Sequence, residues 1–213
     1  MKPIERIQQN LLAVAERRVL NWLCARLPEW VKPDHLTSLG LVGALMVLTG
    51  YAASALHLGW LWLAIAGYCV HWFGDSLDGS LARFRDIERP RFGYFIDHSC
   101  DGLANFMIMA GLGLSPFVRF DVALFALTGY LLMSIHAFLS ARVLGELKLS
   151  YIAAGPTELR VLLVAVTLSM FAIEPEPGWS PFDWLVGAAG AILLAIFVVQ
   201  TIVTARRIAT QGE

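Results

Sequence analysis

Six apolar segments limit what this chain can fold into more than any other feature. Each has charged residues, Gly or Pro close to its ends, and they cover residues 36–56, 61–81, 94–114, 122–144, 159–173 and 184–205. A helix of about 20 apolar residues crosses the hydrocarbon core of a typical bilayer. The chain is also 57% hydrophobic and only 15% charged, which is too apolar for a soluble globule. We therefore expect an all-α, polytopic membrane protein with six transmembrane helices, the fifth of them short.

The first 30 residues differ from these segments because apolar and charged side chains are mixed along them. Leu20, for example, closely follows Arg17 and Arg18. No apolar core with a small-residue cleavage site follows the basic start, so we do not expect a cleaved signal peptide. Residues 1–30 are instead expected to form an amphipathic helix that lies in the membrane interface.

Lysine and arginine residues gather on one side of the six segments. They precede the first segment, lie between the second and third and between the fourth and fifth, and follow the sixth, whereas only Arg119 falls on the opposite side. The positive-inside rule therefore predicts that both termini and the connection between the second and third segments are cytoplasmic. The small size of the chain suggests a bacterial inner membrane. Because no repeat or linker divides it, residues 1–213 are expected to form one membrane domain, with the six helices in residues 36–205.

Four aspartates stand at the neighbouring ends of the second and third segments. Asp75 and Asp78 are three residues apart, and Asp97 and Asp101 are four apart, so each pair shares a helix face. Charges in apolar segments are costly and are therefore candidates for function. Repulsion within such a group favours a bound divalent cation, and all-oxygen ligands suit magnesium, manganese or calcium better than zinc or copper. For any single aspartate, solvation of a helix end or an ion pair with a nearby arginine is an alternative explanation.

The residues that follow the first pair suit a phosphate ligand. Gly79 and Ala82 carry little side-chain bulk, so a large ligand can approach the helix backbone there. Arg83 offers a planar fork of hydrogen-bond donors that matches a phosphate group.

Together these residues form a motif, Asp75-x-x-Asp78-Gly79-x-x-Ala82-Arg83, nine residues, Gly93-x-x-x-Asp97-x-x-x-Asp101. The motif resembles the signature of the CDP-alcohol phosphotransferases, integral membrane enzymes of phospholipid synthesis. These enzymes pass a substituted phosphate group from a CDP-linked donor to an alcohol acceptor and release CMP, and one of the two substrates is a lipid. The resemblance implies a divalent metal cofactor, two ions of Mg²⁺ or Mn²⁺, and a homodimer. We expect no nucleic-acid partner.

Roles for individual residues follow from this resemblance. Asp75, Asp78 and Asp97 would hold the metal, and Asp101 would complete a second metal site or act as the general base that takes the proton from the acceptor. The CDP portion would lie against Gly79, Ala82, Arg83 and Gly93. Thr37 resembles a residue that lies near the nucleotide, although Asp34 stands where the family often has Asn and Thr37 is equally suited to a helix N-cap.

Outside the motif the pattern leaves alternatives open. Arg142, Arg160 and His98 are candidates for binding an anionic acceptor or a lipid phosphate, and the two arginines are alternatively anchors on the positive side of the membrane. His98 belongs to Asp97-His98-Ser99-Cys100-Asp101, which resembles the Asp-His-Gly-Cys-Asp of the choline and ethanolamine branch, with Ser99 as the departure. The roles of His71 and His136 stay open.

Two donor classes and one rival function remain. CDP-diacylglycerol is favoured as the donor by the small size of the chain, and a CDP-choline or CDP-ethanolamine type of reaction on a lipid hydroxyl is favoured by His98 and Cys100. Paired carboxylates on membrane helices also occur in divalent metal-ion transporters, which is the alternative from a different class. A transporter, however, predicts acidic residues near the bilayer midplane on several helices.

Overall fold

The computed structural model describes residues 5–7, 13–148, 156–175 and 178–211. These residues are almost entirely helical, which confirms the all-α prediction in outline. The α-helices among them are α1 (Ala13–Cys24), α2 (Pro33–Ala53), α3 (Leu61–Phe84), α4 (Pro90–Leu114), α5 (Phe120–Leu144), α6 (Pro156–Ser169) and α7 (Pro181–Gln211). Two single-turn 3₁₀ helices, Leu58–Trp60 and Met170–Ala172, precede α3 and follow α6.

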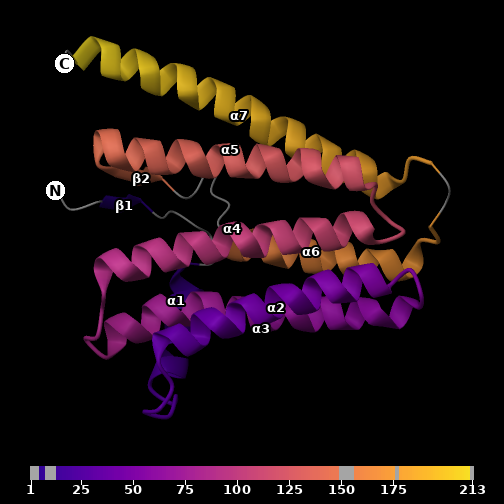
Figure 1. Ribbon diagram of the computed structural model, residues 1–213, viewed down its shortest axis with the longest axis horizontal. Helices are drawn as coiled ribbons and strands as arrows, with labels where there is room; N and C mark the ends of the chain where they lie inside the picture. The colour runs from indigo at the N-terminus through magenta and orange to yellow at the C-terminus, as the bar shows by residue number, and fades with distance from the viewer. Residues whose placement is uncertain (1–4, 8–12, 149–155, 176–177, 212–213) are drawn as a thin grey trace.

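The helices α2 to α7 run side by side along the long axis of the molecule (Figure 1). The connections α2–α3, α4–α5 and α6–α7 lie at one end. The α3–α4 connection, the end of α5 and the C-terminal end of α7 lie at the other end. The α3–α4 connection and the C-terminal end of α7, which are both expected to be cytoplasmic, therefore lie at the same end of the bundle.

Proline and glycine mark where helices begin and end. Four helices have proline as their first residue, namely Pro33, Pro90, Pro156 and Pro181. Proline suits this position because its fixed φ matches the helix and its missing N–H has no intrahelical partner there. Helix α5 ends at Gly145, whose φ of +74° is a left-handed conformation that glycine adopts without strain.

Three helices in the described part of the chain are long and apolar enough to cross a membrane: α2, α5 and α7. Helices α3 and α4 have 24 and 25 residues, but they carry the four aspartates. Helix α6 has only 14 residues. The structure thus supports three candidate spans by composition, and the six-span arrangement remains a prediction.

The N-terminal region differs from the expected helix over residues 1–30. Helix α1 covers only Ala13–Cys24, and strand β1 (Glu5–Ile7) pairs in parallel with strand β2 (Glu146–Lys148) just after α5. The remaining residues of the first twelve, 1–4 and 8–12, lie outside the described part. The expectation fails at residues 5–7 because their main chain is extended and pairs with a distant segment.

Close packing of α2 against α3 organises the centre of the molecule. Gly74 lies against the backbone of Gly40, and Gly43 lies against the backbone of His71 and Gly67, so that a Cβ atom added at Gly43 or Gly74 would collide with main-chain atoms. Small residues let helix backbones approach closely in membrane proteins. This contact brings the first turns of α2 beside the end of α3 that carries Asp75 and Asp78.

Candidate active site

A small pocket lies where α2, α3 and α4 meet. It is lined by three of the four predicted aspartates together with neighbouring residues, namely Thr37, Gly40, Leu41, His71, Asp75, Asp78, Asp97, Cys100 and Ala104. Asp101 lies one helical turn beyond Asp97, and its side chain interacts with that of Asp75 across the two helices. The structure therefore brings the two carboxylate pairs together, as the spacing predicts.

Asp78 is buried and is held on both of its oxygens. Thr37 donates a hydrogen bond from its hydroxyl to Asp78 Oδ2 at 2.7 Å, and the main-chain N–H of Gly79 donates to Oδ1. The hydroxyl of Thr37 is thus turned toward a carboxylate, and Lys32 is the N-cap residue of α2. The position of Asp78 is fixed from α2 as well as from its own helix.

Asp75 is paired with Arg160 of α6. The same guanidinium lies 3.5 Å from Nε2 of His71, while Nδ1 of His71 lies 3.1 Å from the carbonyl oxygen of Gly40. A carbonyl oxygen can only accept, so Nδ1 carries the proton and Nε2 accepts from Arg160. The buried His71 therefore orients Arg160, which in turn orients Asp75.

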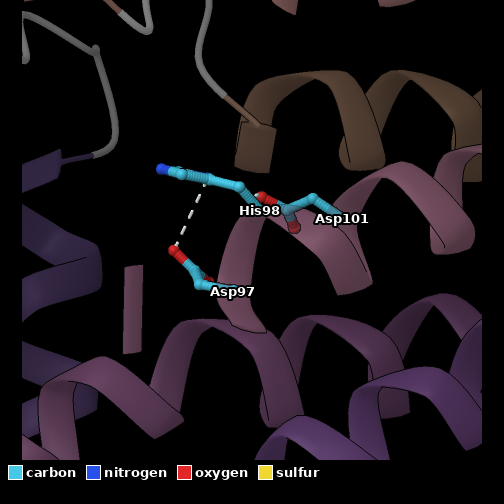
Figure 2. Close-up of side chains that lie close together, drawn as sticks. All are labelled: Asp97, His98 and Asp101. Atoms are coloured by element: carbon cyan, nitrogen blue, oxygen red, sulfur yellow. Dashed lines mark ion pairs between the residues drawn. The ribbon is translucent and has the colours of Figure 1, made fainter. Parts of the chain in front are cut away.

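Asp97, His98 and Asp101 gather on one stretch of α4 (Figure 2). Nδ1 of His98 lies 3.8 Å from Asp97 Oδ2 and 3.5 Å from Asp101 Oδ2. The imidazole packs between Tyr94 and Phe138, with ring centroids 4.4 and 4.9 Å away. Its Nε2 atom is buried and has no hydrogen-bond partner among the described residues. The ring is thus held by aromatic side chains with one nitrogen directed at both carboxylates.

The donor set fits a hard divalent cation. Asp97, His98 and Asp101 each offer one potential ligand atom, and these three atoms lie within 4.8 Å of one another. Asp75 and Asp78 approach the same region from α3. Carboxylate oxygens are the ligands that Mg²⁺ and Mn²⁺ prefer. Four carboxylates with one arginine leave an excess of negative charge that a cation would neutralise.

The predicted CDP-binding residues follow this site toward the end of α3 and the start of α4. Arg83 is exposed and donates to Ser80 at 3.3 Å, and its guanidinium lies 3.4 Å from the place where a Cβ atom of Gly79 would be. Ala82 is half-buried. Gly93 is exposed and faces open space.

The two predicted anion-binding arginines lie in different surroundings. Arg160 contacts Asp75 and His71 directly and so belongs to the site. Arg142 is exposed in the last turn of α5 and does not line the pocket. His136 is buried elsewhere, where its Nε2 lies 3.2 Å from Thr204 Oγ1 and links α5 to α7.

Two residues with many contacts were not predicted from the sequence. Glu16 of α1 accepts hydrogen bonds from Trp72, Ser76 and Thr157. A signal for Glu16 does exist, because it shares a face of α1 with Leu20 and Cys24, the buried side of that helix.

The other unpredicted residue is Arg85, which follows α3. It donates to four main-chain carbonyls in the segment between α1 and α2, those of Leu27, Pro28, Glu29 and Val31. Nothing in the local sequence distinguishes it from the other arginines of the α3–α4 connection.

The fold and the site define a class of helical membrane protein in which acidic residues of two helices share one pocket. Comparison with known proteins gives that class a family. The sequence model of the CDP-alcohol phosphatidyltransferase family matches residues 30–205. The chain therefore belongs to the CDP-alcohol phosphatidyltransferase family, and its enzyme class is that of the transferases of substituted phosphate groups.

Individual relatives carry the names of several different enzymes. The chain is 29% identical over 163 residues to archaetidylinositol phosphate synthase of Methanothermobacter thermautotrophicus, which covers 76% of this chain and 75% of that protein. It is 28% identical over 122 residues to cholinephosphotransferase 1 of Danio rerio, covering 51% of this chain and 32% of that protein. It is also 32% identical over 90 residues to phosphatidylinositol phosphate synthase of Cutibacterium acnes, covering 42% of this chain and 41% of that protein. The chain thus spans only about a third of the zebrafish protein but three quarters of the archaeal one.

Proposed function

We propose that this protein transfers a substituted phosphate group from a CDP-linked donor to an alcohol acceptor, within a membrane, and releases CMP. The observation that carries the proposal is the meeting of two carboxylate pairs, from α3 and α4, at a pocket that three of the four aspartates line. Membership of the family supports it, because the family match covers residues 30–205 and so includes all four aspartates.

Asp75, Asp78, Asp97 and Asp101 are proposed to hold Mg²⁺ or Mn²⁺, as two ions. A metal bound there would neutralise charge on the pyrophosphate as the phosphoanhydride bond breaks. Thr37, through its bond to Asp78, and Arg160, through its bond to Asp75, hold two of these carboxylates in place. Fixed ligand positions reduce the rearrangement that binding requires.

Asp101 is proposed to act as the general base for the acceptor hydroxyl. It lies beside Asp75 and within 3.5 Å of His98 Nδ1, so its carboxylate has an oriented neighbour on each side. The base removes the hydroxyl proton as the acceptor oxygen attacks the phosphorus atom, and CMP departs.

Gly79, Ala82, Arg83, Gly93 and Thr37 are proposed to accommodate the CDP portion. Arg83 is exposed one turn beyond Gly79, where its guanidinium can reach a phosphate. The open space beside Gly93 leaves room for a nucleotide at the start of α4. On the acceptor side, Arg160, Arg142 and His98 are proposed to bind a phosphate, with Arg160 in the best position because it already reaches Asp75.

CDP-diacylglycerol or a similar CDP-linked lipid is the donor that we favour. The match to archaetidylinositol phosphate synthase extends over three quarters of that protein, which supports a lipid donor and a phosphorylated alcohol acceptor. A second candidate is the cholinephosphotransferase type of reaction. His98 and Cys100, between the third and fourth aspartates, and the match to the zebrafish protein favour it.

In the membrane we propose six spans formed by α2 to α7 within one domain of residues 1–213. The α3–α4 connection, which joins the two helices that carry the aspartates, lies at the same end of the bundle as β1 and the end of α7 (Figure 1). This arrangement supports a cytoplasmic site with cytoplasmic termini. A bacterial inner membrane and a homodimer complete the proposal.

The test is a product assay. The purified protein is incubated with Mg²⁺ or Mn²⁺, a CDP-linked donor (CDP-diacylglycerol, CDP-choline or CDP-ethanolamine) and a panel of alcohol acceptors, and CMP is measured. We expect CMP to appear with one donor class and to depend on acceptor and metal. If no combination releases CMP while vesicles containing the protein take up Mn²⁺ without any nucleotide, the transporter alternative is correct instead.

A further inference from the structure

Helix α1 is attached to the core by a buried face and by one charged residue. Leu20 and Cys24 on that face pack with Leu77 and Leu81 of α3. Glu16 lies on the same face, one turn before Leu20, where a carboxylate is unexpected unless it is paired.

One oxygen of Glu16 collects three donors from two other helices. Oε1 accepts from Trp72 Nε1 at 2.9 Å, from Ser76 Oγ at 3.3 Å and from Thr157 Oγ1 at 2.6 Å. All four side chains of this Glu16 cluster are half-buried. Hydrogen bonds to a charged acceptor are shorter and stronger than neutral ones, so the cluster ties α1, α3 and the first turn of α6 together.

The Glu16 cluster lies directly beside the aspartate site. On α3, Trp72 and Ser76 each follow a residue of the site, His71 and Asp75. On α6, Thr157 precedes Arg160 by three residues, which is about one helical turn. The two helices are therefore joined twice in neighbouring places, once through Glu16 and once through Arg160.

We propose that Glu16 is a positioning residue for the reaction. By fixing the first turn of α6 through Thr157, it sets where Arg160 meets Asp75 and His71. Glu16 touches none of the proposed substrate or metal positions. It also lies before residue 30, where the family match begins, so the inference concerns a part of this chain outside that match. The expected effect of Glu16 on the reaction rests on the proposed function. Its expected effect on the position of α6 does not.

The test compares four single variants of the full-length protein in detergent. Glu16→Ala removes the acceptor, Thr157→Val removes only the donor on α6, and Thr157→Ser keeps a hydroxyl there. Leu20→Ala is the matched control, because it weakens the apolar contact of α1 with α3 and leaves the three hydrogen bonds in place.

Hydrogen–deuterium exchange of the α6 amides from residue 160 to 164 is the first measurement. Loss of a charge-assisted hydrogen bond predicts exchange about tenfold faster in Glu16→Ala and Thr157→Val. In Thr157→Ser we expect the α6 amides to exchange at the wild-type rate. In Leu20→Ala we expect faster exchange in α1 alone. Unchanged α6 exchange in Glu16→Ala, or an equal effect of Leu20→Ala, overturns the proposal, and this result does not depend on the activity.

Release of CMP is the second measurement. We expect kcat to fall about tenfold in Glu16→Ala and in Thr157→Val while KM for the donor stays unchanged, because the lost interaction orients catalytic groups and does not bind the donor. A double variant that combines Glu16→Ala with Thr157→Val is expected to be no slower than the slower of the two single variants, since both changes remove the same hydrogen bond. A wild-type kcat in Glu16→Ala contradicts the proposal. If the wild type releases no CMP, the proposed function is wrong and the exchange result alone decides the role of Glu16.

Discussion

The hydroxyl of Thr37 on α2 donates a hydrogen bond of 2.7 Å to Oδ2 of Asp78 on α3. These residues are 41 positions apart in the chain. They meet because Gly40 and Gly43 of α2 allow its backbone to lie directly against α3. A contact between two helix backbones thus determines the orientation of a proposed metal ligand.

Thr37→Val removes this hydrogen bond with little change in volume. Because the bond is made to a carboxylate, we expect it to contribute about 1.5–3 kcal/mol to the free energy that holds Asp78 in position. The metal concentration needed for half-maximal CMP release should rise about tenfold or more. Thr37→Ser, which keeps the hydroxyl, should behave like the wild type. Equal metal dependence of the valine variant and the wild type would show that Thr37 does not orient Asp78.

Gly74→Ala tests the close contact of α2 and α3. A methyl group at this position would collide with the backbone of Gly40, which cannot move aside as a flexible side chain can. We expect the free energy of unfolding to fall by about 1–3 kcal/mol and CMP release to fall with it. Thermal unfolding in detergent is the measurement. Gly187→Ala is the control, because its added methyl would make an ordinary contact of 3.6 Å with Val122, and it should not lower the melting temperature.

Much of the helical arrangement could be predicted from local sequence. The start of α2 at Pro33 and of α4 at Pro90, and the end of α5 at Gly145, follow from short-range backbone preferences. The pairing of the aspartates also follows from helical spacing. The N-terminal prediction was less accurate, because residues 5–7 pair with a segment more than 100 residues away, and helical periodicity contains no information on such a contact.

The partners of the site residues could not be predicted in this way. Arg160 lies 85 residues from Asp75, and Thr157 lies 141 residues from Glu16. These pairs depend on how α6 packs against α3, which local sequence does not determine. Sequence reasoning singled out Arg160 as a candidate anion-binding residue and left its partner open. His98 was expected near a phosphate, and the structure adds the aromatic contacts with Tyr94 and Phe138 that hold its ring.

Asp101→Asn tests the proposed general base. The amide keeps the size of the side chain but cannot take a proton, so we expect kcat to fall about 10²–10⁴-fold while the donor still binds. Quenched-flow measurement of CMP release, together with equilibrium binding of a CDP-linked donor, separates the two effects. Asp121→Asn is the control, because Asp121 is paired with Arg119 at the opposite end of the bundle. Near-normal turnover in the Asp101 variant would exclude this role.

Arg85→Lys tests how the segment before α2 is held. Arg85 reaches four main-chain carbonyls with its planar fork, including that of Val31 at 2.6 Å, and a lysine ammonium cannot reproduce this arrangement. We expect the free energy of unfolding to fall by about 1–3 kcal/mol. Amide exchange over residues 27–32 should become faster at the same time. Arg91→Lys, at an exposed position in the first turn of α4, should leave both quantities unchanged. If both variants unfold alike, Arg85 does not stabilise this segment.

The central claim is that carboxylates from α3 and α4 hold a divalent metal jointly. Titration with Mn²⁺, followed by electron paramagnetic resonance of the free ion, tests it without any assumption about the substrate. We predict saturable binding in the wild type that is lost or strongly weakened in both Asp78→Asn and Asp97→Asn, one variant from each helix, and retained in Asp121→Asn. Equal Mn²⁺ binding by the wild type and by the Asp78 and Asp97 variants would contradict the account.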